Sequence, residues 1–329
     1  MIYDFVIVGA GSAGCILASR LSESGRYSVL LIEAGGKDDS FWFKIPVGYA
    51  KSYYNPKVNW MYSTEPEPAL GDRRIYVPRG KVQGGSGSIN AMVYVRGAST
   101  DFDDWAAAGN AGWSANDVLP YFKALETHRN GASDYHGNRG PIHVTPMRGS
   151  THAVSDAFLK ACQELGLPAS DDFNGRDIEG AGVYDINTRN GQRSHSSAEY
   201  LRPALKRPNL AIERHAFAQR LILAADGKAE AVEVLQHGTI RLFKARREVI
   251  LAAGAVDTPK LMQLSGLGDG ALLFSHGIKT HRHLPAVGQN LQDHLCASFY
   301  YRANCPTLNG TFASLFGQAA LGLQYLLTR

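Results

Sequence analysis

Residues Ile2–Gly14, IYDFVIVGAGSAG, specify how the fold begins. Ile2–Val8 is a short apolar, β-branched run, which is typical of a buried parallel strand. It leads directly into Gly9–Gly14, a G-x-G-x-x-G sequence, and a helix-like segment follows from Ser12 to about Ser24. A strand, a glycine turn and a helix in this order predict a Rossmann-like α/β domain that binds a dinucleotide.

Each residue of this turn has an expected role. Gly9 makes the tight turn, Gly11 lets a pyrophosphate approach the backbone, and Gly14 lets the helix pack closely on the strand. Ser12 and Ala13 open the helix, where unpaired N–H groups and the positive end of the dipole face the phosphates.

A second strand, Ser28–Ile32, ends at Glu33, about 20 residues past the last glycine, where a carboxylate accepts from a ribose hydroxyl. The G-x-G-x-x-G motif is weak evidence alone, but the two flanking strands and the acid make it strong evidence for dinucleotide binding. An acidic residue here disfavours NADP, because it would repel the extra phosphate. At this point an NAD-dependent Rossmann enzyme remains an alternative.

Three further segments carry information. Arg79–Gly97, RGKVQGGSGSINAMVYVRG, is rich in glycine and predicts a main-chain cradle for an anionic or planar ligand, although alone it could be a surface loop. Arg247–Gly268, REVILAAGAVDTPKLMQLSGLG, predicts a buried strand over Glu248–Ala252, a small-residue turn, and a helix that begins at Thr258-Pro259. The third segment, VGQNLQDH, is a polar loop that ends at His294.

Together these segments resemble the glucose–methanol–choline (GMC) oxidoreductases, FAD-dependent flavoproteins that oxidise alcohols. Gly84–Gly97 is similar to the first signature of that family and Gly254–Gly268 to the second, in the family's order and spacing. The resemblance runs from Met1 to at least His294 and is nearest to the choline-dehydrogenase-like branch. It implies FAD rather than NAD, and hydride transfer from a CH-OH group to flavin N5.

The resemblance also implies which residues bind FAD. The glycine turn and Glu33 would hold the ADP half, Val82 and Asn90–Val93 would line the isoalloxazine and ribityl portion, and the backbone of Ala218 would touch the adenine. The full expected set is Gly9, Gly11, Ser12, Ala13, Gly14, Glu33, Val82, Gly85, Ser86, Asn90, Ala91, Met92, Val93, Ala218 and Gly254. No histidine precedes His128, so we expect non-covalent FAD, without the histidine tether of some members.

The family's catalytic histidine and its His or Asn partner lie well beyond both signatures, so the resemblance implies that they lie beyond Arg329. We therefore expect no catalytic residue within this chain, which resembles a truncated version of the pattern. The alternative is a flavin-binding remnant that does not oxidise alcohols.

The fold class expected is α/β, with a Rossmann-like FAD-binding domain interleaved with an incomplete α+β substrate domain. We assign residues 1–141 and 191–294 to the FAD-binding domain, and residues 142–190 and 295–329 to the substrate domain.

Composition excludes several other functions. The net charge of +4 is spread along the chain without a basic, aromatic-rich stripe, so we expect no nucleic-acid partner. The four cysteines form no C-x-x-C, and His281-Arg282-His283 lacks a third ligand, so we expect no metal site. The first strand begins at once, without a signal peptide, which predicts a cytoplasmic location. Phe312–Leu327 is too short to span a bilayer and predicts a packed helix, with at most peripheral membrane contact.

The expected partners are an alcohol substrate and an electron acceptor, quinone or oxygen. Residues 295–329 contain no Asp or Glu to pair with a trimethylammonium group. We therefore expect a complete version of the protein to prefer neutral primary alcohols over choline.

Overall fold

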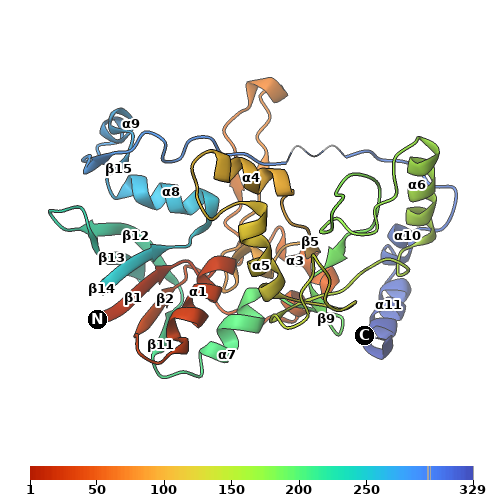
Figure 1. Ribbon diagram of the computed structural model, residues 1–329, viewed down its shortest axis with the longest axis horizontal. Helices are drawn as coiled ribbons and strands as arrows, with labels where there is room; N and C mark the ends of the chain where they lie inside the picture. The colour runs from red at the N-terminus through yellow and green to blue at the C-terminus, as the bar shows by residue number, and fades with distance from the viewer. Residues whose placement is uncertain (295, 297, 329) are drawn as a thin grey trace. The chain divides into compact units, whose positions relative to one another are not determined.

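The structure is a computed structural model that describes residues 1–294, 296 and 298–328 (Figure 1). It divides into two compact units. The first contains Met1–Ala91 and His195–Asp293, and the second contains Met92–Ser194 and His294–Arg329. Each unit is therefore built from two separated parts of the chain.

These units differ from the expected domains mainly at the first boundary, which follows Ala91 and not residue 141. Residues 92–141 belong to the second unit because their strands pair within it. Val93–Tyr94 (β5) pairs with Asp185–Ile186 (β8), and Glu126–His128 (β6) pairs with Ile142–Val144 (β7). The assignment of FAD and substrate to particular domains stays a prediction.

A six-stranded sheet forms the centre of the first unit, in the order β11-β2-β1-β14-β13-β12. The neighbours from β11 to β14 are parallel, and β14, β13 and β12 continue the sheet antiparallel. The strands are β1 (Ile2–Val8), β2 (Val29–Ile32), β11 (Leu210–Glu213), β12 (Ala216–Leu223), β13 (Ala229–Gln236) and β14 (Thr239–Leu251). The strands predicted at Ile2–Val8 and Ser28–Ile32 are confirmed, and the one predicted at Glu248–Ala252 is the end of the longer β14.

Short helices and strands complete the first unit. The helices are α1 (Ser12–Glu23), α2 (Phe41–Lys44), α3 (Tyr49–Ser52), α7 (Arg202–Ala204), α8 (Gly254–Leu264) and α9 (Gly270–Ser275). The single turns are η1 (Pro46–Gly48), η2 (Pro68–Leu70), η3 (Gly85–Ser88) and η4 (Ser197–Leu201), and the small strands are β3 (Tyr62–Ser63), β4 (Tyr76–Val77), β15 (Leu267–Gly268) and β16 (Arg282–His283).

Both faces of the parallel strands are covered, which explains why β2 and the second half of β1 are apolar. On one face Val8 and Ile32 join a buried cluster that includes Leu261 of α8. On the other face Ile7 joins a second cluster that includes Ala18 of α1, and α7 packs beside α1 (Figure 1). The sheet is therefore the middle layer of the first unit, and the loops that follow its strands begin from packed strand ends.

One predicted boundary in this unit is wrong. Helix α8 begins at Gly254, about one turn before the expected start at Thr258-Pro259, and Pro259 lies inside it. Gly254 has φ +87°, a conformation that glycine adopts without strain, and this lets the chain enter the helix soon after β14 ends. The early start places the first turn of α8 next to the glycine turn that follows β1.

The second unit contains small paired strands and helices. They are β5, α4 (Ser99–Ala107), α5 (Ala115–Leu125), β6, β7, α6 (Ala153–Glu164), β8, β9 (Thr188–Arg189), β10 (Gln192–Arg193), α10 (Leu308–Phe312) and α11 (Leu315–Thr328). Helix α11 forms where a helix was predicted, but the predicted packing is wrong, because Leu315 and Leu327 are largely exposed. Across the described residues, no helix has both the length and the apolarity that a bilayer span requires.

Candidate nucleotide-binding site

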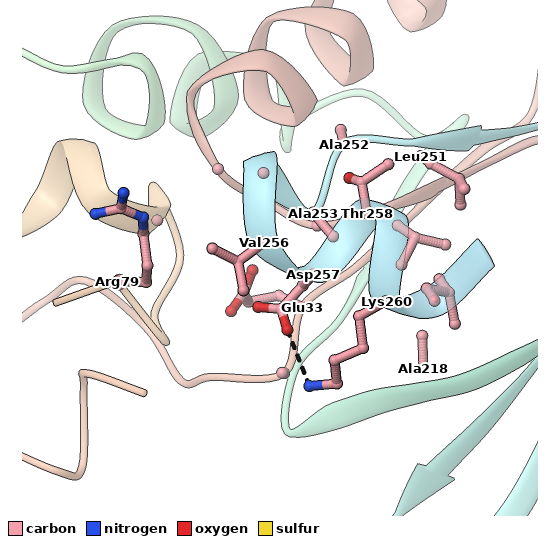
Figure 2. Close-up of a pocket in the computed structure, with 18 of the residues that line it drawn as sticks. Glu33, Arg79, Ala218, Leu251, Ala252, Ala253, Val256, Asp257, Thr258 and Lys260 are labelled. Carbon is pink, nitrogen blue, oxygen red and sulfur yellow. Dashed lines mark hydrogen bonds and ion pairs between the residues drawn. The ribbon is translucent and has the colours of Figure 1, made fainter. Parts of the chain in front are cut away.

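A cavity of about 480 Å³ lies wholly within the first unit, where β1, β2 and β14 end (Figure 2). Its volume is within the usual range for small-molecule sites, and the carboxyl ends of parallel strands are where α/β sheets bind ligands. The residues of the expected set that line it are Gly9, Gly11, Ser12, Ala13, Glu33, Gly85, Ser86, Ala218 and Gly254. Five segments that are separated in sequence thus meet at one site.

The first glycine turn has no room for side chains where the chain folds back on itself. Gly9 has φ +99°, and a β-carbon on it would lie 2.5 Å from the carbonyl oxygen of Ala252. A β-carbon on Gly14 would lie 1.9 Å from the Gly9 carbonyl oxygen, whereas one on Gly11 would meet no atom closer than 3.9 Å. Gly14 is thus a packing residue, and the space beside Gly11 is open to a ligand.

The N-terminus of α1, which is the positive end of the helix dipole, faces this space. No side chain caps it, and its first turn contains no acidic residue. The first N–H groups of a helix lack partners within the helix, so this end suits a phosphate or pyrophosphate.

Glu33 is buried at the end of β2, and its carboxylate joins two backbone segments. Its Oε2 accepts a hydrogen bond from the Ala10 N–H at 2.9 Å, and its Oε1 accepts one from the Gly35 N–H at 2.8 Å. Burial raises the pKa of Glu33 to about 7, although both N–H donors oppose this shift. The acid predicted to bind ribose therefore also holds the glycine turn in shape.

This pKa predicts a pH dependence of stability. Glu33 titrates near 4.5 when unfolded and near 7 when folded, so its pKa is raised by folding and the folded state binds the proton more tightly between these values. The stability that protonated Glu33 contributes is therefore fully present below about pH 4.5 and is lost as the pH rises through about 7. Urea unfolding should show the wild type losing more stability over this window than Glu33→Gln, and parallel curves would contradict the prediction.

A second glycine turn packs directly on the first. The N–H of Gly84 donates to the Ala10 carbonyl oxygen at 2.7 Å. A β-carbon on Gly85 would lie 2.8 Å from the Gly11 α-carbon, and Gly84 and Gly85 both have positive φ. The cavity wall here is bare backbone, as the glycine-rich sequence predicted.

The residues expected at the isoalloxazine are not among those that line the cavity. Val82 is fully buried and packs with Phe43 and Ile89. Asn90 and Ala91 are exposed at the end of the first part of the first unit, and Met92 and Val93 belong to the second unit. Their contact with a flavin ring stays a prediction.

Sequence reasoning missed a group of side chains at the cavity. Trp60 and Tyr62 stack with ring centroids 5.8 Å apart, and the Lys260 ammonium lies 5.8 Å from the Trp60 ring centroid and 5.5 Å from that of Tyr62. Tyr62 donates to Asp257 Oδ1 at 2.7 Å. Lys260 pairs with the same oxygen at 3.0 Å (Figure 2). Burial and Asp257 raise the pKa of Tyr62, so it stays a donor.

A sequence signal for this group exists in hindsight. Trp60 and Tyr62 are two residues apart in W-x-Y, a spacing that puts two rings on one face of an extended strand, although here the intervening Met61 has φ +57° and is not extended. Asp257 and Lys260 are three residues apart, which puts them on one face of a helix. Neither pattern shows that the two pairs meet.

The fold and the cavity define an α/β nucleotide-binding protein, and comparison with known proteins identifies the family. The sequence model of the GMC oxidoreductases matches residues 3–296, so the chain belongs to that family. An oxygen-dependent choline dehydrogenase of Rhizobium meliloti (strain 1021) is 44% identical over 324 residues, which are 98% of this chain and 58% of the relative. The chain therefore spans less than two thirds of the length of this relative.

Solved structures agree. Pyridoxine 4-oxidase from Mesorbium loti superposes with a TM-score of 0.85 and 33% identity, over 88% of this chain and 57% of that chain. An FAD-dependent oxidoreductase from Chaetomium thermophilum gives a TM-score of 0.81 and 33% identity, over 88% of this chain and 52% of that chain. The resemblance noted in the sequence is confirmed, and the family and these neighbours support FAD as the nucleotide.

The residues present fit the ADP half of FAD. The two glycine turns leave backbone exposed to the cavity, the N-terminus of α1 is uncapped, and Glu33 borders the same space. No group of three or more His, Cys, Asp or Glu residues able to hold a metal ion occurs among the described residues.

Proposed function

We propose that this chain binds FAD non-covalently and forms the FAD-binding part of an oxidoreductase that acts on CH-OH groups. The observation that carries the proposal is the cavity where three segments meet: the first glycine turn after β1, the glycine turn at residues 84–88 and the start of α8. Bound FAD supplies the hydride acceptor for oxidation of a primary alcohol to an aldehyde.

The chain's own contribution is to bind and orient this group. Gly11 and the N-terminus of α1 offer N–H groups to the pyrophosphate, and Glu33 offers a carboxylate oxygen to the ribose. Ala218 of β12 lines the same cavity, and its backbone would touch the adenine. No catalytic base is assigned within this chain, and its expected place beyond Arg329 stays a prediction.

We expect the purified chain to bind FAD in a saturable manner, measured by quenching of flavin fluorescence. Acid precipitation should release the flavin into the supernatant, because no histidine occurs in the first signature to tether it. Flavin retained in the pellet would contradict non-covalent binding. Binding of NADH without binding of FAD would overturn the proposal itself.

The substrate is proposed as a primary alcohol, choline-like or neutral, and the acceptor as quinone or oxygen. The choline dehydrogenase relatives support choline, whereas the absence of acidic residues from 295–329 supports a neutral alcohol. Comparing the turnover of choline with that of a medium-chain alcohol by a complete version of the protein decides between them. A flavin-binding remnant remains the second candidate, and an endogenous protein whose intact mass corresponds to these 329 residues alone would favour it.

A further inference from the structure

A buried polar network lies behind the glycine turn at residues 84–88, within the first unit. His195 is at its centre, and its Nδ1 lies 3.3 Å from Ser88 Oγ, while its Nε2 lies 3.4 Å from Asp38 Oδ2. All three side chains are almost completely buried. Sequence analysis did not single out any of them.

Gln83 connects the network to the turn. Its Nε2 donates to Asp38 Oδ1 at 3.1 Å and to Ser197 Oγ at 2.8 Å, and its Oε1 accepts from Arg214 Nε at 2.8 Å. Its backbone carbonyl oxygen accepts from Ser88 Oγ at 2.8 Å, which ties the two ends of the turn together. Every polar atom of the Gln83 side chain is thus used inside the protein.

A serine, a histidine and a carboxylate in contact also occur in hydrolases, but the geometry here does not support that activity. Ser88 is fully buried, and its hydroxyl donates to a backbone carbonyl oxygen. An accessible nucleophile is required for acyl transfer, so the group has a different role.

That role follows from the glycine content of the turn, which leaves it with few side chains. Its glycines lose more conformational entropy on ordering than other residues do, and they have no side chains with which to fix themselves. The imidazole of His195 packs against Gly84, because a β-carbon there would lie 3.0 Å from Nδ1. Gly85 in turn contacts Gly11, so a shift of this turn would reach the pyrophosphate side of the cavity.

We propose that His195 is a positioning residue that holds the glycine turn at residues 84–88 in its nucleotide-binding conformation through Ser88 and Gly84. Asp38 orients the imidazole from its far side, and Arg202 pairs with the same carboxylate at 2.9 Å. This inference rests on the proposed binding of FAD.

Two substitutions of His195 separate its contact with Ser88 from its contact with Asp38. An asparagine amide reaches the place of a histidine Nδ1, and a glutamine amide reaches that of Nε2. His195→Asn should therefore keep the contact to Ser88 and an FAD Kd near that of the wild type. His195→Gln should keep only the contact to Asp38, and its Kd should rise about 10–100-fold, as for loss of one buried hydrogen-bond partner.

Fluorescence titration with FAD measures both affinities, and urea unfolding without FAD measures stability. His136→Asn is the control, because His136 is equally buried between two carboxylates, Glu126 and Asp172, but in the second unit. It should lower stability and leave the FAD Kd unchanged.

The outcomes are distinct. The inference is overturned if the wild type binds FAD and both His195 variants bind it as tightly as the wild type does. It is also overturned if the variants lose FAD affinity only in proportion to their loss of stability. If the wild type does not bind FAD, the proposed function fails first. Rescue by Asn and not by Gln supports the assignment.

Discussion

Gly14→Ala is expected to destabilise the first unit strongly. The added β-carbon would lie 1.9 Å from the Gly9 carbonyl oxygen and 3.1 Å from its carbonyl carbon, both of which are backbone atoms that no rotamer change can move. Either α1 shifts away from β1 or the glycine turn opens, and both changes disrupt the core that contains Ile7 and Ala18. A loss of about 4 kcal/mol or more would remove much of a typical stability of about 5–15 kcal/mol.

Circular dichroism and urea unfolding check this result against Gly270→Ala. Gly270 begins α9 in the same unit, and a β-carbon there would meet only side-chain atoms at 3.4 Å or more. The control should unfold close to the wild-type midpoint. A Gly14→Ala protein with the wild-type midpoint would show that the helix and the strand are not packed as closely as the structure has them.

The parts of the fold that the sequence predicts are those with a local cause. β1 and α1 follow from an apolar run and a glycine turn, and both form within one residue of the expected bounds. The start of α8 was misplaced because Pro259 suggested a first turn, whereas the positive φ of Gly254 sets the actual start. A glycine's conformation depends on what surrounds it, and one sequence does not show that.

The candidate site likewise contains residues that the sequence predicts and residues that it does not. Gly9, Gly11 and Glu33 meet at the cavity, because the order strand, turn, helix fixes where they lie. Trp60 and Lys260 were missed because their meeting depends on how residues distant in sequence pack, and no local spacing encodes it. The His195 network was missed for the same reason, since Asp38, Ser88 and His195 come from three separate segments.

Gly11→Ala is expected to leave the fold intact and to remove most of the FAD affinity. Gly11 has φ −71° and ψ −167°, which alanine adopts without strain, and an added β-carbon meets only the Ala252 carbonyl oxygen, at 3.9 Å. That carbon would occupy the space in which the pyrophosphate must approach the backbone. Loss of one or two charge-assisted hydrogen bonds, at about 1.5–3 kcal/mol each, corresponds to a Kd increase of at least about tenfold and up to about 10⁴-fold.

Gly11→Ala and Gly14→Ala form a matched pair, because both add one carbon to the same turn. If the two glycines have these roles, Gly14→Ala loses stability of the fold, whereas Gly11→Ala loses only the nucleotide. Fluorescence titration with FAD and urea unfolding, applied to both proteins, separate these effects. A Gly11→Ala protein that binds FAD as tightly as the wild type would mean that the pyrophosphate does not pass Gly11. The cavity would then have to hold its ligand in another orientation.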